Sequence, residues 1–178
     1  TVHMCKYDVT QAFLSSQQKR LVFVKHPPGY KLVQGEKSLY YVALEPGEKQ
    51  PKTVMQLYLA LYGGIECSRL YWEAWISWHT SYGFKRSHYD KCYIYLVKGD
   101  SFIKMSFHVD DGMVAWKGDD LWADYIQSVK KRFDVDFDEL KGSTKFLGAN
   151  FHLDREKGVC LIDQEIIVDK MLADFGMT

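Results

Sequence analysis

The sequence predicts an α+β fold in which an antiparallel sheet is backed by helices. The apolar fraction of 47% and the aromatic fraction of 15% are typical of a packed core, and 178 residues fit one domain. Strand-like and helix-like stretches interleave along the chain. The gaps between neighbouring strand-like runs are short, which favours antiparallel pairing because parallel strands need long crossovers.

The N-terminal part begins with a strand-like run over 2–9 that contains Asp8 near its end. A second strand is expected over 21–24, before a Pro-Pro-Gly stop. The stretch over 31–56 is interpreted as a variable connecting segment, within which 38–44 could form a strand. Apolar residues then recur at helical spacing over 68–82, and Gly83 is a stop signal.

The C-terminal part is expected to hold further strands and two more helices. Asp119 or Asp120 could cap the first of these helices, and basic residues in its last turn would suit the negative end of the helix dipole. Gly176 stops the second. The expected strands cover 92–97, 102–109, 113–116, 146–153 and 159–162, and the expected helices 119–133 and 164–175.

The charge balance and the cysteines exclude some function classes. Lys+Arg and Asp+Glu both total 23, so net charge gives no sign of a nucleic-acid footprint. The four cysteines are scattered without zinc-ligand spacing, which indicates reduced structural thiols. We find no membrane-length apolar run and no signal peptide, so an intracellular location is expected for what looks like a piece of a longer protein.

Asp110 and Asp111 are the most informative pair of residues. They lie between the apolar runs 102–107 and 113–116, and Asp-Gly between two such runs is a strong hairpin signal. Two carboxylates at a hairpin tip repel each other by about 4 kcal/mol at close range. A divalent cation turns this repulsion into attraction, and Mg²⁺ prefers carboxylate oxygens. The alternative interpretation is a solvated Asp-Gly turn.

Asp8 is the third acidic residue of interest, because it ends a separate strand. An acid there is often only a turn or cap residue. However, a carboxylate pair from one hairpin plus a third carboxylate from another strand meets the requirement of a two-metal site, in which one cation activates the attacking oxygen and the other stabilises the leaving group.

Several motifs extend this pattern along the chain. Together they resemble the reverse transcriptase domain of copia-type long-terminal-repeat retrotransposon polyproteins, nearly end to end, and their order and spacing are specific. The matching segments are 8–14, 25–30, 61–63 with Arg69, 83–92, 109–111, 146–148 and 164–177.

The resemblance implies a right-hand polymerase palm with partial fingers over residues 1–178, truncated at both ends. Within it, 146–162 would form primer-grip-like hairpins, and 164–176 a helix leading toward the thumb. Integrase would precede this region in the polyprotein, and the thumb and ribonuclease H would follow it.

The resemblance also implies roles for the acids. Asp8 and Asp110 would be the principal ligands of two Mg²⁺ or Mn²⁺ ions, with the Val9 carbonyl assisting and Asp111 completing the cluster. The implied reaction is attack of a primer 3′-hydroxyl on the α-phosphate of a deoxynucleoside triphosphate, with loss of pyrophosphate.

Other matching positions would contact the nucleotide. Phe13 would act as a steric gate against a ribose 2′-hydroxyl, and its alternative role is plain core. Gly63 would allow close backbone approach, and Arg69 belongs to the same nucleotide-binding motif. Lys141 or Lys145 would protonate the departing pyrophosphate, and the alternative interpretation of each is a solvated loop lysine.

The primer end would lie against His108, Leu147 and Gly148. His108 departs from the family, which has Tyr at this place. Glu66 is a second departure, because the family's middle motif carries no acid there, and an acid near a triphosphate would hinder binding.

The expected function is RNA-directed DNA synthesis, with a primed RNA or DNA template, dNTPs and the rest of the Pol polyprotein as partners. The family locates this activity in cytoplasmic virus-like particles or the nucleus, and the fragment alone is expected to have little activity. The alternatives are a non-catalytic or domesticated remnant, which keeps the fold and binds nucleic acid or a partner, and an unrelated metal-dependent phosphohydrolase.

Overall fold

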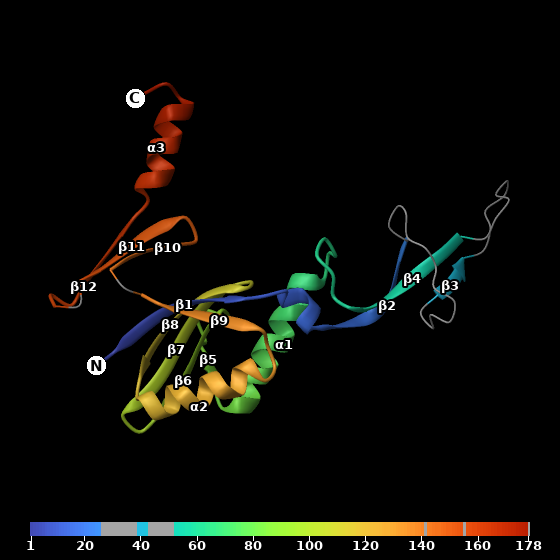
Figure 1. Ribbon diagram of the computed structural model, residues 1–178, viewed down its shortest axis with the longest axis horizontal. Coiled ribbons are helices and arrows are strands. Elements are labelled where there is room, and N and C mark those ends of the chain that lie inside the picture. The colour runs from blue at the N-terminus through green and yellow to red at the C-terminus, as the bar shows by residue number, and fades with distance from the viewer. Residues whose placement is uncertain (26–38, 43–51, 141, 155, 178) are drawn as a thin grey trace. The chain divides into compact units, whose positions relative to one another are not determined.

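The computed structural model describes residues 1–25, 39–42, 52–140, 142–154 and 156–177. The chain divides into two compact units. Unit 1 comprises Thr1–Thr10 and Gly83–Thr178, and unit 2 comprises Gln11–Tyr82. The described part is a mixed α+β structure with antiparallel sheets and three α-helices, which confirms the predicted fold class (Figure 1).

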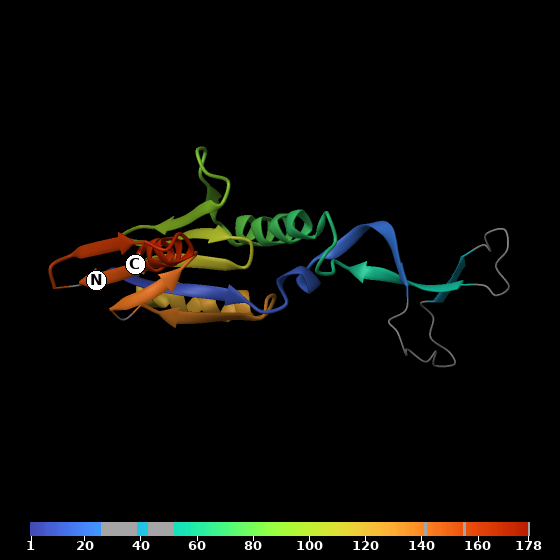
Figure 2. The same ribbon diagram turned by 90° about the horizontal axis from the view of Figure 1, so that it is seen from above.

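The main sheet of unit 1 has six strands in the order β5-β6-β7-β8-β1-β9, and all neighbours are antiparallel. β1, the first strand in sequence, therefore lies between two strands that come much later (Figures 1 and 2). The strands are β1 (His3–Val9), β5 (Lys85–Arg86), β6 (Tyr93–Lys98), β7 (Ser101–His108), β8 (Asp111–Lys117) and β9 (Val135–Glu139). β5 and β9 differ from the expected strands, none of which covers their residues.

Alternation along β1 gives the sheet one buried and one open face. Cys5 and Tyr7 are buried, whereas Asp8 is exposed on the opposite face. Helix α2 (Asp119–Lys130) covers the buried face, where Trp122 stacks on Trp116 with ring centroids 4.3 Å apart. Aromatic pairs of this kind contribute about 1 kcal/mol beyond the burial of their surface. The opposite face of the sheet is not covered by α2, and Asp8 is exposed there.

The start of α2 differs from the expectation. Gly118 is the N-cap residue and has a φ of 99°, while Asp119 and Asp120 lie inside the first helical turn. A Cβ at position 118 would collide with the Ser101 side chain, which explains the glycine. The predicted aspartate cap is therefore wrong, although both acids still suit the positive end of the dipole. The helix ends at Lys130, earlier than expected.

Unit 1 also contains a three-stranded sheet in the order β10-β11-β12, followed by α3 (Figure 1). These elements are β10 (Ser143–Phe146), β11 (Ala149–Asp154), β12 (Val159–Asp163) and α3 (Glu165–Asp174). The single strand expected over 146–153 is wrong, because Leu147 and Gly148 form a turn with φ values of 48° and 78°. Positive φ at both central residues is typical of a tight two-residue hairpin.

Unit 2 contains helix α1 and a three-stranded sheet in the order β2-β4-β3. Its elements are η1 (Ala12–Ser15), β2 (Gln17–Lys25), β3 (Leu39–Val42), β4 (Lys52–Leu59) and α1 (Cys67–Tyr82). Helix α1 confirms the prediction, and β3 agrees with the possible strand over 38–44. β4 corrects the interpretation of 31–56 as connection; residues 31–38 and 43–51 lie outside the described residues.

In the described ranges, the three α-helices are all too short or too polar to cross a lipid bilayer.

Candidate functional site

The turn between β7 and β8 carries the adjacent aspartates. His108 pairs with Asp111 across the two strands, so Val109 and Asp110 are the turn residues. Val109 has a φ of 57° and Asp110 has no positive φ, which is the pattern of a type II′ turn. The predicted hairpin is confirmed. Of the two carboxylates predicted at its tip, Asp110 lies in the turn, whereas Asp111 is the first residue of β8.

Gly112 is needed inside the strand rather than at the turn. It lies opposite Tyr7 of β1, and a Cβ at position 112 would collide with the Tyr7 ring. The turn itself uses Val109, although a β-branched residue is strained at positive φ. Strained backbone conformations of this kind are common at functional sites, where the surrounding structure holds them in place.

The strand register aligns ionisable residues across four strands. Asp8 of β1 lies opposite Asp111 of β8 on one side and opposite Asp136 of β9 on the other. His108 of β7 continues the row, since it lies opposite Asp111. Directly opposed residues of antiparallel strands project from the same face. We call Asp136, Asp8, Asp111 and His108 the carboxylate row.

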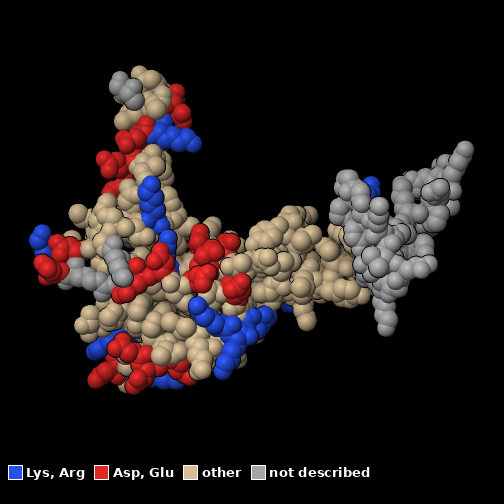
Figure 3. Space-filling model, in the orientation of Figure 1, with Lys and Arg blue, Asp and Glu red and all other residues tan. Residues whose placement is uncertain are grey.

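The carboxylate row lies on the open face of the sheet. Asp8, Asp111 and Asp136 line a shared depression of about 270 Å³, together with Lys6 and Asp138, which form an ion pair at 3.3 Å. Acidic side chains gather on this part of unit 1 in the space-filling view (Figure 3). No described cation forms an ion pair with the acids of the row, so their mutual repulsion is not relieved within the described structure.

Asp110 is attached to the row through the backbone. The Val9 N–H donates a hydrogen bond to the Asp110 carbonyl oxygen at 3.2 Å. This bond fixes the hairpin turn against the end of β1, and so positions the Asp110 side chain near the start of the row.

The electrostatics of Asp8 reflect this crowding. Partial burial raises the pKa of the Asp8 carboxyl above its ordinary value, and the nearby charges of Asp111, Asp110 and Asp136 raise that pKa further. A raised carboxyl pKa among other carboxylates is typical of a site that binds a cation.

The described side chains therefore suit divalent cations by the type of their donor atoms and not by their spacing. Among the described residues, no three His, Cys, Asp or Glu side chains are gathered closely enough to hold a metal ion. The donor set does fit Mg²⁺ or Mn²⁺, because Asp8 and Asp111 are opposed hard oxygen donors. Partial burial, followed by the charges of the neighbouring acids, raises the pKa of Asp8. The ligand roles of Asp8, Val9, Asp110 and Asp111 stay predictions.

A second cavity joins Asp111 to the β10–β11 turn. It measures about 310 Å³, and its walls include Asp111, Lys145, Leu147 and Gly148. A Cβ at Gly148 would lie 3.2 Å from the Ile167 side chain of α3, so this turn packs tightly on the helix. Leu147 and Gly148, two of the three residues predicted to hold the primer, therefore share a cavity with one of the paired aspartates, and His108 does not line it. Lys141 lies outside the described residues.

The remaining predicted residues belong to unit 2. The Phe13 ring lies 4.5 Å from Tyr62 and packs against a cluster containing Ala60, Cys67 and Leu70. Gly63 has a φ of 90°, a conformation that L side chains rarely adopt, and this explains the glycine independently of any ligand.

Arg69 lies on α1, where it forms ion pairs with Glu66 at 3.3 Å and Glu73 at 3.8 Å. The unexpected acid Glu66 is thus compensated by a neighbouring cation rather than left unpaired.

Sequence reasoning missed Asp136. Its strand was not predicted, because Asp134, Asp136 and Asp138 make the segment look polar. The available signal was the alternation of these acids with Val135 and Phe137, which has the period of a half-buried strand.

Comparison with known proteins gives two kinds of match. A family profile described as "Reverse transcriptase (RNA-dependent DNA polymerase)" matches residues 1–178. The putative transposon Ty5-1 protein YCL074W of Saccharomyces cerevisiae is 26% identical over 160 residues, which is 90% of this chain and 46% of that protein. The retrovirus-related Pol polyprotein from transposon TNT 1-94 of Nicotiana tabacum is 24% identical over 171 residues, 96% of this chain and 12% of that protein. The chain thus spans less than half of each relative.

Proposed function

Because the chain belongs to the reverse transcriptase family, as its resemblance to copia-type retrotransposon polyproteins predicted, we propose that it is the RNA-directed DNA polymerase palm, with part of the fingers, of such a polyprotein. In this proposal unit 1 is the palm, 146–162 is the primer grip, and α3 leads toward the thumb. The partners are a primed RNA or DNA template, dNTPs and the remaining Pol domains.

The observation that carries the proposal is the opposition of Asp8 and Asp111 beside the Asp110 turn, with the pKa of Asp8 raised. An ordinary solvated turn would not align acids from β1, β8 and β9 on one open sheet face. Acids that repel one another lower the stability of the fold, so their joint placement favours a functional role.

The residues of the chain would divide the work of nucleotidyl transfer. Asp8, Asp110 and Asp111, with the Val9 carbonyl, would hold two divalent cations. When bound, these cations supply the charge that activates the primer 3′-hydroxyl and stabilises departing pyrophosphate. The Val9–Asp110 backbone bond keeps the turn in place, and the strand register keeps Asp8 against Asp111. These backbone constraints would hold the proposed ligands in place before substrate binds.

Other residues would position the substrates. His108, Leu147 and Gly148 would hold the primer end, which is supported by the cavity that Leu147, Gly148 and Asp111 share. Phe13, Gly63 and Arg69 would contact the incoming nucleotide. For Phe13 the packing against Tyr62 supports a structural role as well.

A non-catalytic remnant is the second candidate. It is favoured by one observation, that the side chains of the described residues do not form a three-ligand metal group. Such a remnant would keep the fold and the strand register without supporting synthesis.

Primer extension by the complete polyprotein in Mg²⁺ or Mn²⁺ separates the two candidates. We expect extension by the parent protein and a loss of at least about 10³-fold on Asp110→Asn, because a charged metal ligand is removed without a change of shape. Asp100→Asn, at an exposed turn residue between β6 and β7, is the matched control and should retain activity. A well-folded parent that does not extend a primer would support the remnant. The isolated 178-residue chain is expected to be weakly active or inactive.

A further inference from the structure

Five charged side chains of unit 2 form a continuous network between β2 and α1. Glu66 Oε1 lies 3.4 Å from Arg20 Nη2 and 3.3 Å from Arg69 Nη2. Glu73 Oε1 lies 3.8 Å from Arg69 Nε, and its other oxygen accepts a short hydrogen bond from Lys19 Nζ. We call this set of three cations and two acids the β2–α1 charge network.

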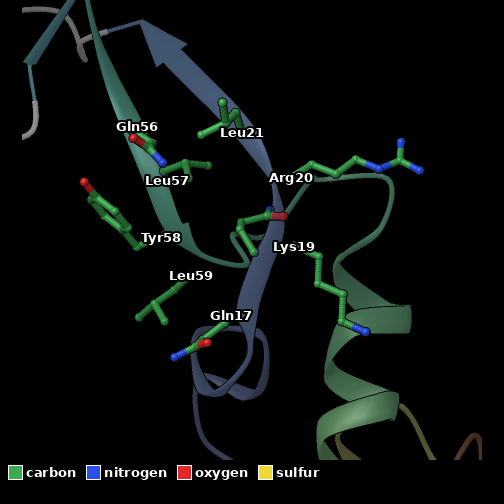
Figure 4. A pocket seen from close by; sticks show the side chains of 9 residues that line it. Gln17, Lys19, Arg20, Leu21, Gln56, Leu57, Tyr58 and Leu59 are labelled. Atoms are coloured by element: carbon green, nitrogen blue, oxygen red, sulfur yellow. The ribbon is translucent and has the colours of Figure 1, made fainter.

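An irregularity in β2 turns the side chains of Lys19 and Arg20 toward α1 (Figure 4). Gln17 pairs with Leu59, yet Val22 pairs with Leu57, so the β2 residues between Gln17 and Val22 have only Tyr58 opposite them. A bulge re-aims the side chains of the longer strand. Figure 4 shows Lys19 and Arg20 extending to the α1 side, whereas Tyr58 extends the other way.

The cations of the network are far more exposed than the acids. Side-chain exposure is 64% for Lys19, 74% for Arg20 and 60% for Arg69. It is 29% for Glu66 and 33% for Glu73. Ion pairs between exposed side chains add little stability, because water and salt screen them. Phosphate oxygens bind guanidinium groups in a bidentate manner and can therefore replace such carboxylate contacts.

We propose that the β2–α1 charge network is a binding surface for the phosphate backbone of a nucleic-acid strand, and that Glu66 and Glu73 restrain this binding. In the free protein the two acids occupy Lys19, Arg20 and Arg69. A strand that binds must take over these cations, and the displaced carboxylates then lie close to its phosphates. The choice of nucleic acid as ligand rests on the proposed function, whereas the charge exchange rests on the ion pairs.

This arrangement accounts for the departure at Glu66. The sequence predicts that an acid at this place hinders the binding of a triphosphate, and the phosphates of a strand carry the same sign of charge. The ion pairs give that hindrance a mechanism, since Glu66 contacts Arg20 and Arg69 at once. The isosteric change Glu66→Gln removes the charge, takes the network partner from Arg20 and leaves Arg69 paired with Glu73 alone.

The test measures binding of a fluorescein-labelled oligodeoxythymidylate to the full chain by anisotropy, with EDTA present so that no metal or polymerisation contributes. We expect Glu66→Gln to tighten binding about fivefold at low salt, and Arg69→Ala to weaken it by a similar factor. Between about 50 and 200 mM salt, affinity should fall more steeply for Glu66→Gln, because Arg20, released from its carboxylate partner, releases counterions on binding. Asp100→Asn, which removes one negative charge at an exposed turn of unit 1, should leave affinity unchanged.

Several outcomes would overturn the proposal. Equal tightening by Glu66→Gln and Asp100→Asn would mean that net charge alone acts. An unchanged salt slope in Glu66→Gln would mean a purely structural network. If Glu66→Gln strengthens competition by inorganic tripolyphosphate but not oligonucleotide binding, the ligand is a free triphosphate instead of a strand. Should Glu66→Gln lose its far-ultraviolet dichroism, Glu73→Gln must meet the same criteria. Because the assay requires no catalysis, failure of primer extension would not affect its result.

Discussion

The carboxylate row of unit 1 and the β2–α1 charge network of unit 2 bring charged residues together in opposite ways. In the row, Asp8 lies between Asp111 and Asp136, and partial burial together with the charges of these acids raises its pKa. In the network, the Lys19 hydrogen bond and the charges of Lys19 and Arg69 lower the pKa of Glu73. The first group would need an added cation to balance its charge. In the second, each acid already pairs with a cation, and only a competing anion would displace it.

This difference has a physical lesson for interpreting charged clusters. Clusters of one sign destabilise the fold until a ligand binds, so ligand binding should raise stability. Clusters of mixed sign contribute little to stability, so a ligand should instead change binding and its salt dependence. Stability measurements therefore test the row, and binding measurements test the network.

The largest expected effect is stabilisation by Mn²⁺. At 100 times its dissociation constant, a ligand specific for the folded state adds about 2.7 kcal/mol, which is about 8 °C in Tm for a chain of this size. Asp8→Asn should abolish the shift and should also raise the Tm of the metal-free protein, since it removes repulsion. Glu66→Gln is the control and should keep the full shift. A Tm that Mn²⁺ leaves unchanged in the wild-type chain would contradict a cation site at the row.

The next effect concerns the register that builds the row. Gly112→Ala should destabilise the fold by about 2 kcal/mol, because the new Cβ would collide with the Tyr7 ring. Urea unfolding measures this loss. In a Tyr7→Leu background the additional cost of Gly112→Ala should shrink, since the ring is gone. Gly99→Ala, at a turn with open space and a φ of 59°, should cost about 1 kcal/mol from backbone strain alone. Equal losses for the two glycines would argue against the Tyr7 contact.

The smallest effect is a pair of opposite pH dependences. The pKa of Asp8 is raised in the folded state, so its contribution to stability is present below the ordinary value of 3.8 and is lost as pH rises through the folded pKa. The pKa of Glu73 is lowered, so its contribution is present above 4.5 and is lost as pH falls through the folded pKa. Relative to the wild type, Asp8→Asn should gain stability with rising pH and Glu73→Gln should gain it with falling pH. Tm values across the acid range measure both, and trends of the same sign would contradict the comparison.

Much of the fold followed from local patterns in the sequence. The helical spacing of apolar residues predicted α1 to within one residue, because this spacing is a local pattern. The Asp-Gly signal predicted the right hairpin, although Asp111 and Gly112 lie in β8 and not in the turn. Its glycine is used for the Tyr7 ring, a contact made with a strand about a hundred residues earlier and invisible to local patterns.

The candidate site was predictable in part for the same reason. Asp8, Asp110 and Asp111 were marked by strand ends and a turn, which are local features. Asp136 was not, because only the pairing of β9 with β1 brings it opposite Asp8. Strand register depends on tertiary packing, and a single sequence does not encode it in any short window.

The position of β1 in the sheet has a consequence for biosynthesis. Among the strands of this sheet β1 is translated first, and its neighbours β8 and β9 follow about a hundred residues or more later. Until then its backbone donors and acceptors have no sheet partners, and the loop that must close is long, which slows folding. The nascent polypeptide therefore carries β1 unpaired until β8 is made, and only the arrival of β9 completes the acidic face.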